Sequence, residues 1–178
     1  AGTKRVPQWS HSRRPHAVRA LILYPLNALV EDQMRRLRSI LDDPGVCRWL
    51  DEERRGNRIT FGRYTSLTPL AGPETPNRVK RLAAQLQDLE AQERAVTEAL
   101  AGREDGSRFH FPSLDSGEVW SRWDAQDAPP DILITNYSML NIMLMRQIEQ
   151  EMFEKTRAWL ESDPSHVFHL VVDELHSY

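Results

Sequence analysis

The chain has 178 residues, with 23 Lys and Arg residues against 26 Asp and Glu residues, so its formal net charge is −3 at pH 7. This length is enough for one hydrophobic core, and the charge balance excludes the basic signature of a histone-like nucleic-acid binder. The single cysteine, Cys47, excludes an internal disulfide and fits a reducing compartment. No apolar run reaches the roughly 18 residues of a membrane span. No signal peptide is visible, so we expect a cytoplasmic protein without a membrane partner.

The N-terminal region is basic and has no regular hydrophobic period. Pro, Arg, His and Ser dominate residues 1–17, which predicts a loop or a disordered arm. Such an arm either contacts phosphates or extends into solvent as a tail, and the solvated tail is the commoner outcome. No acidic residue occurs in residues 1–30. The basic residues of this region are Lys4, Arg5, Arg13, Arg14 and Arg19.

Short apolar segments predict β-strands, and amphipathic segments between them predict helices. The predicted strands are residues 18–24, 58–66, 131–136 and 166–172. Their apolar runs favour strands that are covered on both faces, as in a parallel sheet. Helical spacing of apolar residues follows in residues 26–41, 78–102 and 138–160. The alternation of strand and helix indicates an α/β fold with a parallel sheet and right-handed crossovers.

The predicted domain covers residues 18–178. Within it, residues 78–104 are interpreted as a helical insertion, because their apolar stripe is interrupted and does not reach a coiled-coil repeat. Residues 105–130 are polar and predict a loop, with Trp120 and Trp123 holding it against the body of the domain.

Three polar motifs directly follow predicted strands: "YPLNAL", "TNYSML" and "DELH". In open parallel α/β sheets, ligands bind at the carboxyl ends of the strands. The three motifs therefore predict a functional site along one edge of the sheet.

The last motif brings two adjacent carboxylates, Asp173 and Glu174, to the end of a strand. One carboxylate can hold Mg²⁺, usually through its water shell, and the other can orient or deprotonate a water, as phosphoryl-transfer enzymes require. His176 can relay the state of such a site to a neighbouring element. A plain polar loop is the alternative. A zinc site built with His166 and His169 is disfavoured, because the HExxH spacing is absent and the two side chains do not converge.

These motifs together resemble those of superfamily 2 helicases, the DEAD/DEAH-box (DExH) group of the YprA and Ski2-like type. "VVDELH" resembles motif II, "LILYPLNALVEDQ" resembles motif Ia, and "ILITNYSML" resembles motif Ib, in the order of that family. The similarity covers about residues 18–70 and 128–178. It implies a partial RecA-like parallel sheet of the P-loop NTPase type with a helical insertion. It extends to large bacterial helicases, some of them in phage-defence systems.

The resemblance implies a catalytic role for three residues of motif II. Asp173 would bind Mg²⁺ through water, Glu174 would be the base that positions the attacking water on ATP, and His176 would couple the ATP state to nucleic acid. ATP and Mg²⁺ are the implied cofactors.

The resemblance also implies contacts to a nucleic-acid backbone, and these would be independent of base sequence. The implied residues are Asn27 in motif Ia, Thr135, Asn136 and Ser138 in motif Ib, and Arg63 within the second predicted strand. Helix termini bind phosphate through free N–H groups and the dipole. Asn27 and Ser138 can alternatively be ordinary helix caps. Leu26, Leu29 and Val30 are expected in the core.

The sequence departs from the family at the nucleotide-binding loop. None of its eight glycines is followed by lysine, so the Gly-Lys-[Ser/Thr] of a Walker A loop is absent. The chain is therefore expected to be an internal slice, from motif Ia to motif II, of a larger helicase whose second motor domain lies elsewhere in the same protein. Alone it is expected to be inactive as an ATPase.

The expected partners are single-stranded or duplex nucleic acid, with DNA favoured over RNA, and a protein of a defence complex. The alternative function is a non-catalytic helicase-fold module that binds nucleic acid or a protein.

Overall fold

The computed structural model describes residues 5–9, 12, 14–25, 27–101 and 106–174. Its strands are β1 (Ala20–Tyr24), β2 (Phe61–Tyr64), β3 (Ile132–Asn136) and β4 (His169–Val172). Its α-helices are α1 (Asn27–Leu41), α2 (Pro44–Glu53), α3 (Pro76–Ala99), α4 (Arg122–Asp127), α5 (Tyr137–Met145) and α6 (Gln150–Ser162). Two short 3₁₀ helices complete the fold, η1 (Ser107–His110) and η2 (Gln147–Glu149).

The strands form one all-parallel sheet in the order β2-β3-β1-β4. Parallel neighbours need crossover connections, and helices supply them here, as the alternation of apolar and amphipathic segments predicted. The predicted α/β class with a parallel sheet is confirmed, and the arrangement is consistent with a partial RecA-like sheet.

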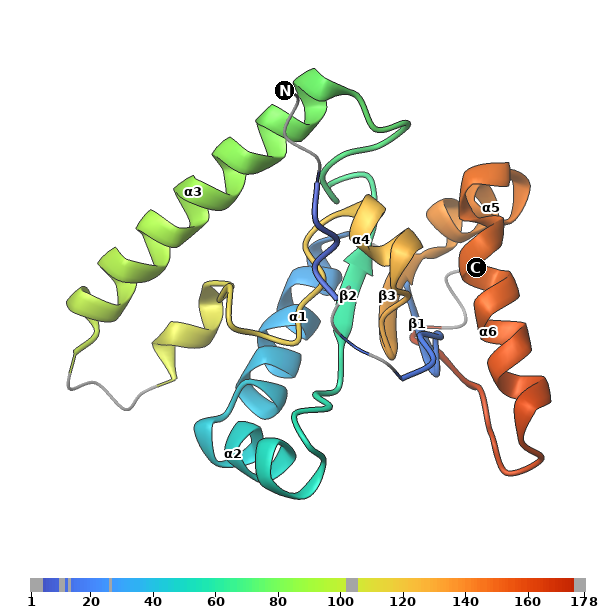
Figure 1. Cartoon of the computed structure of the whole chain (residues 1–178), viewed down its shortest axis with the longest axis horizontal. Coiled ribbons are helices and arrows are strands. Elements are labelled where there is room, and N and C mark those ends of the chain that lie inside the picture. Colours follow the sequence, from blue (N-terminus) through green and yellow to red (C-terminus); the bar gives the residue numbers. More distant parts are fainter. Residues whose placement is uncertain (1–4, 10–11, 13, 26, 102–105, 175–178) are drawn as a thin grey trace.

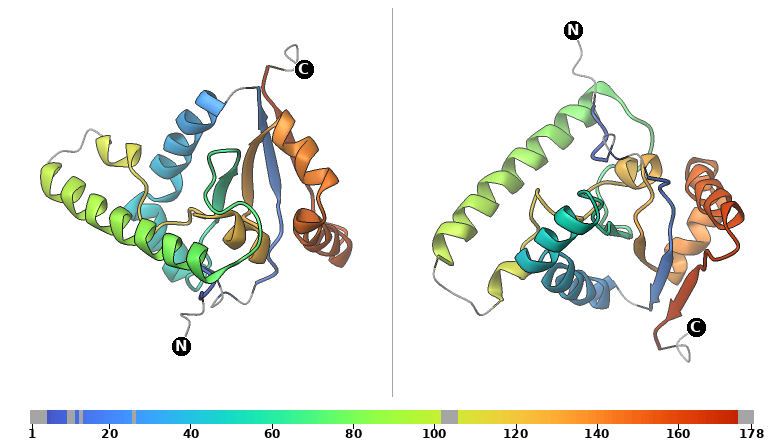
Figure 2. Two further views of the ribbon diagram at one scale, coloured as in Figure 1. Left: turned by 90° about the horizontal axis from the view of Figure 1, so that it is seen from above. Right: turned by 60° about the horizontal axis from the view of Figure 1, so that its bottom comes forward.

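Helices cover the sheet from both sides (Figures 1 and 2). Helix α1 packs on β2 and β3, and α5 packs on β3 from the other face. Alternate strand residues point to opposite faces, so two hydrophobic clusters result. The cluster under α1 contains Tyr24, Val30, Met34, Phe61 and Ile134. The cluster under α5 and α6 includes Val18, Leu21, Leu23, Leu133, Met143 and Met152.

The last strand differs from the prediction, because β4 is not buried. It lies at the edge of the sheet beside β1, and Leu170 and Val171 are 57% and 48% exposed. Its apolar sequence suggested cover on both faces, but an edge strand has a neighbour on one side only. The expectation of a buried final strand is therefore wrong for these residues.

The residues predicted to end the first helix, α1, also begin a second helix, α2. Helix α1 ends at Leu41 as expected, but Asp43 then caps α2 by accepting hydrogen bonds from the backbone N–H groups of Gly45 and Val46. Pro44 occupies the first turn of α2, where its missing N–H costs nothing. The Asp-Pro-Gly sequence is thus a helix start as well as a helix stop.

The apolar stripe of α1 is only partly buried. Val30 and Met34 lie in the core, whereas Leu29 and Ile40 are exposed. The prediction of Leu29 in the core is therefore wrong, and Leu26 lies outside the described residues.

The helical region after β3 is broken where the sequence predicted one continuous stretch. Helix α5 ends at Met145, η2 follows, and α6 begins at Gln150. Asn136, rather than Ser138, caps α5 by accepting a hydrogen bond from the backbone N–H of Met139 at 2.8 Å.

Helix α3 is the long helix expected in the insertion, and it stands at one side of the body (Figure 1). Only Leu82 of this helix is buried. The loop after it returns to the body at Trp123, which is buried and donates from its indole Nε1 to the backbone oxygen of Gly72 at 2.6 Å. Trp123 therefore attaches this region to the body as predicted, but it does so from helix α4, and η1 lies in the same region, so the prediction of a loop over residues 105–130 is partly wrong. No helix within the described ranges has the length and apolar character needed to cross a membrane.

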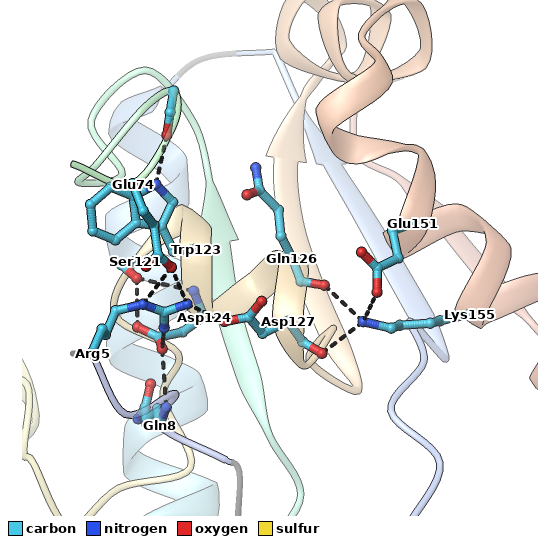
Figure 3. Close-up of polar contacts among 11 residues, drawn as sticks. Arg5, Gln8, Glu74, Ser121, Trp123, Asp124, Gln126, Asp127, Glu151 and Lys155 are labelled. Atoms are coloured by element: carbon cyan, nitrogen blue, oxygen red, sulfur yellow. Dashed lines mark hydrogen bonds and ion pairs between the residues drawn. The ribbon is translucent and has the colours of Figure 1, made fainter.

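The described part of the N-terminal arm is packed against the body and is not a solvated tail (Figure 3). The Arg5 side chain is 7% exposed and forms ion pairs with Glu74, Asp124 and Asp127. Further along, Arg14 pairs with Asp131. Arg19 pairs with Asp131 as well, so carboxylates of the same chain neutralise these three arginines, whereas Lys4 and Arg13 lie outside the described residues.

Truncation of Leu133 is a test of the hydrophobic core between the sheet and α5. Leu133 is 1% exposed, and we expect Leu133→Ala to lower the free energy of unfolding by about 2–5 kcal/mol, because truncation leaves a cavity. Leu144→Ala is the matched control, since Leu144 is 59% exposed, and it should change stability by less than about 0.5 kcal/mol. Urea unfolding measures both. Equal effects of the two variants would contradict this account of the core.

Candidate functional site

The carboxyl ends of the strands lie at one edge of the sheet in a continuous register. Tyr64 of β2 pairs with Thr135 of β3, Thr135 pairs with Leu23 of β1, and Leu23 pairs with Val172 of β4. The segments that follow these residues therefore leave the sheet side by side. This edge is where the sequence predicted the site.

Asp173 continues the pairing of β4 by one residue, because its backbone N–H donates to the oxygen of Leu23 at 3.0 Å. Its carboxylate is exposed and accepts a hydrogen bond from the backbone N–H of Glu174 at 3.1 Å. Glu174 has a φ of 48°, in the left-handed region that side chains other than glycine rarely adopt. Such backbone strain is concentrated at functional sites. The third predicted motif II residue, His176, lies outside the described residues.

The negative charge of Asp173 acts on Tyr24, the last residue of β1. Burial raises the pKa of the Tyr24 phenol, and the negative charge of Asp173 raises it further. Tyr24 is itself buried, so the acidic pair stands beside a hydrophobic strand end.

The two asparagines predicted to contact nucleic acid are hydrogen-bonded to each other. Nδ2 of Asn136 donates to Oδ1 of Asn27 at 2.7 Å, and Nδ2 of Asn27 is 3.4 Å from Oγ of Ser66. Asn27 opens α1 and Asn136 caps α5, so their amides join two helix N-termini and the loop after β2. The structure therefore brings the "YPLNAL" and "TNYSML" segments together in one polar group.

The other predicted backbone-binding residues are placed differently. Thr135 is 0% exposed, and its hydroxyl donates to the backbone oxygen of Tyr64 at 2.6 Å, so it fixes β2 to β3. Ser138 is exposed in the first turn of α5. Arg63 forms an ion pair with Glu31, so its charge is already compensated.

A buried hydrogen-bonded group behind this edge was not predicted. The Tyr64 hydroxyl donates to Oε1 of Glu149 at 2.9 Å and accepts from Nε2 of Gln126 at 2.9 Å. Burial, followed by the Glu149 charge, raises the pKa of Tyr64 well above its usual range. Tyr64 and Glu149 are 85 residues apart in the sequence, so no local pattern could have linked them.

The donor groups at this edge suit a hard cation shared with a ligand better than a closed metal centre. Among the residues that the structure describes, no group of three or more His, Cys, Asp or Glu side chains could hold a metal ion. His166 instead stacks on Trp159 with ring centroids 4.3 Å apart. Mg²⁺ is commonly held by one or two carboxylates together with substrate phosphates, and the exposed Asp173 carboxylate fits that mode.

The parallel sheet with helices on both faces defines an α/β protein of the open-sheet class. The chain is similar to the Druantia protein DruE of Escherichia coli (strain UMEA 4076-1), with 31% identity over 198 aligned residues. The alignment covers 90% of this chain and 11% of that relative, so the chain spans about a ninth of the length of DruE. No protein-family model matches the chain. No solved structure matches it.

Proposed function

We propose that this chain is part of an ATP-dependent nucleic-acid helicase or translocase, within a protein that acts in antiviral defence. The motif resemblance supports the helicase part of the proposal, and the similarity to the Druantia protein DruE supports the defence context. Because the chain spans a small part of that relative, the activity belongs to the intact protein and not to these residues alone.

The observation that carries the proposal is the in-register end of the sheet. Asp173 follows β4 and Asn136 ends β3, and the two strands flank β1 on either side. An acidic pair suited to phosphoryl transfer and an amide pair suited to a phosphodiester backbone therefore share one edge. Coupling between ATP and the nucleic acid needs such proximity, because both ligands must contact residues at the same ends of the strands.

Asp173 would hold Mg²⁺ through water, and Glu174 would orient the attacking water and accept its proton. A metal held in this way would supply positive charge against the phosphates of ATP. Asn27 and Asn136 donate amide hydrogen bonds to the sugar-phosphate backbone, and Ser138 adds a hydroxyl. Thr135 is a positioning residue, because its hydroxyl ties β3 to β2. His176 remains the proposed link between the two ligands.

The alternative is a non-catalytic module that binds nucleic acid or a protein through the helicase fold. In the intact protein, a Gly-Lys-[Ser/Thr] loop directly upstream of these residues would support the enzyme, and its absence there would favour the module, because phosphate-binding loops supply much of the grip on a nucleotide. The presence of both motif II acids favours the enzyme.

Nucleic-acid-stimulated ATP hydrolysis by the intact protein tests the proposal. We expect single-stranded DNA to stimulate hydrolysis more than RNA of the same sequence. The logarithm of the DNA affinity should fall linearly with the logarithm of the salt concentration, by about 0.7 for each phosphate contacted. DNA binding without hydrolysis would favour the binding module, and the absence of both would overturn the proposal.

A further inference from the structure

A hollow of about 400 Å³ lies between the loop after β2 and the first turns of α3. Its charged lining consists of two arginines, Arg78 and Arg81, and it has no acidic lining residue. Uncharged residues form the rest of the wall. The loop residues that line it are Ser66, Leu67, Thr68, Pro69, Leu70 and Ala71, and Gln85 completes it from α3.

The loop that forms this hollow is ordered by internal hydrogen bonds. Oγ1 of Thr68 donates to the backbone oxygen of Arg63 at 2.9 Å and accepts from the backbone N–H of Thr65 at 2.9 Å. Arg122 donates from Nη2 to the backbone oxygen of Thr65 at 2.7 Å. The wall is therefore preorganised rather than a chance gap between flexible segments.

Arg78 is held in place without losing its charge. Its Nη1 donates to the backbone oxygens of Ala71 and Pro73 at 2.8 and 3.1 Å, and these acceptors are neutral. The guanidinium lies against Gly72, where an added Cβ would come within 2.8 Å of Nη1. Gly72 has a φ of 84°, a conformation that favours glycine. The result is a fixed cation that pairs with no carboxylate among the residues that the structure describes.

Arg81 lies one helical turn after Arg78, so both side chains are on the same face of α3. Arg81 is exposed, and within the described ranges no hydrogen bond or ion pair engages it. Arg94, which lies near the other end of the same helix, differs in this respect, because Arg94 pairs with Glu90 at 2.7 Å. Two uncompensated arginines thus face one hollow.

The hollow is continuous with the candidate backbone-binding edge. Ser66 lines it and is also the residue 3.4 Å from the amide of Asn27, which in turn accepts a hydrogen bond from Asn136. A polar path therefore runs from the end of β3 through the start of α1 to the two arginines. A backbone bound at the asparagines would meet the hollow next.

We propose that Arg78 and Arg81 form a further phosphate site for the nucleic-acid backbone, provided by the insertion helix α3. This inference rests on the proposed function. It gives α3 a role that motifs Ia and Ib do not include. Guanidinium groups suit this ligand, because they donate bidentate hydrogen bonds to phosphate. The contact reads charge and not base identity, so it extends the strand-binding surface without adding sequence preference.

Binding of a fluorescent single-stranded DNA to the intact protein tests the inference by anisotropy across a range of salt concentrations. We expect Arg81→Glu to weaken binding roughly tenfold for all sequences, and to reduce the salt slope by about 0.7. Arg81→Gln should weaken binding less, in the same direction. Arg94→Glu is the matched control, because it makes the same charge change on the same helix away from the hollow, and it should leave affinity within about twofold.

The outcomes separate this inference from the proposed function. Loss of affinity on Asn136→Ala together with equal affinities of Arg81→Glu and Arg94→Glu would overturn the phosphate site alone. Wild-type protein that binds no nucleic acid would overturn the proposed function and this site with it. A selective effect of Arg81→Glu, with an unchanged thermal midpoint, supports the site.

Discussion

Replacement of Glu174 by glutamine in the intact protein is expected to stop ATP turnover while leaving nucleotide binding near normal. Glutamine keeps the size of the side chain but cannot accept a proton from water, and general bases contribute about 10²–10⁴-fold to rate. We therefore expect a fall in kcat of about that size, with little change in nucleotide Kd. Steady-state hydrolysis and equilibrium binding of a fluorescent nucleotide measure the two quantities.

Two further variants show whether the expected loss of turnover is specific to the Asp173–Glu174 pair. Glu154→Gln makes the same change at an exposed position of α6 and should retain full turnover. Asp173→Asn should lower turnover and also weaken the binding of Mg²⁺, because it alters the proposed metal-holding carboxylate and not the base. Near-normal turnover of Glu174→Gln would remove Glu174 from the proposed role.

The largest loss of stability is expected from Glu118→Ala. Glu118 and Arg38 are 4% and 5% exposed and form a two-pronged ion pair, with Nε–Oε2 and Nη2–Oε1 distances of 2.6 and 2.9 Å. Removal of one partner leaves a buried charge without compensation, which typically costs about 3–5 kcal/mol. Urea unfolding should report a loss of this size.

The exposed pair Arg157–Glu161 provides the control, since surface ion pairs contribute about 0–1 kcal/mol. Glu161→Ala should therefore have a small effect. A double replacement, Arg38→Met with Glu118→Leu, should be less damaging than Glu118→Ala, because no charge is left buried. A double variant less stable than Glu118→Ala would contradict the explanation by an uncompensated charge.

Local patterns predicted the sheet well because a short apolar run within a few residues identifies each strand. The run at residues 18–24 and the run at 131–136 are continuous and apolar, and both became adjacent parallel strands, β1 and β3. The exposure of β4 could not be predicted in the same way. The exposure of a strand depends on its position in the sheet, and this position is not encoded in the segment itself.

The candidate edge was predicted in part, and the missing part consists of long-range contacts. Asn27 and Asn136 were expected separately, but their mutual hydrogen bond joins residues 109 apart in the sequence. The Arg5 ion pairs span 69 to 122 residues, so the basic arm looked like a tail. Short-range cues predict that a polar residue ends a strand, but they do not predict which partner it meets.

The opposite rim of the sheet has a mechanical consequence through Asp131. The backbone oxygen of Asp131 accepts from the N–H groups of Arg19 and Ala20, and its carboxylate accepts from the N–H of Thr60 and pairs with Arg14. One aspartate thus clamps the starting ends of three strands. Because these hydrogen bonds tie the starting ends of β1, β2 and β3 to one another, we expect a displacement of one of these strands to be transmitted to the other two.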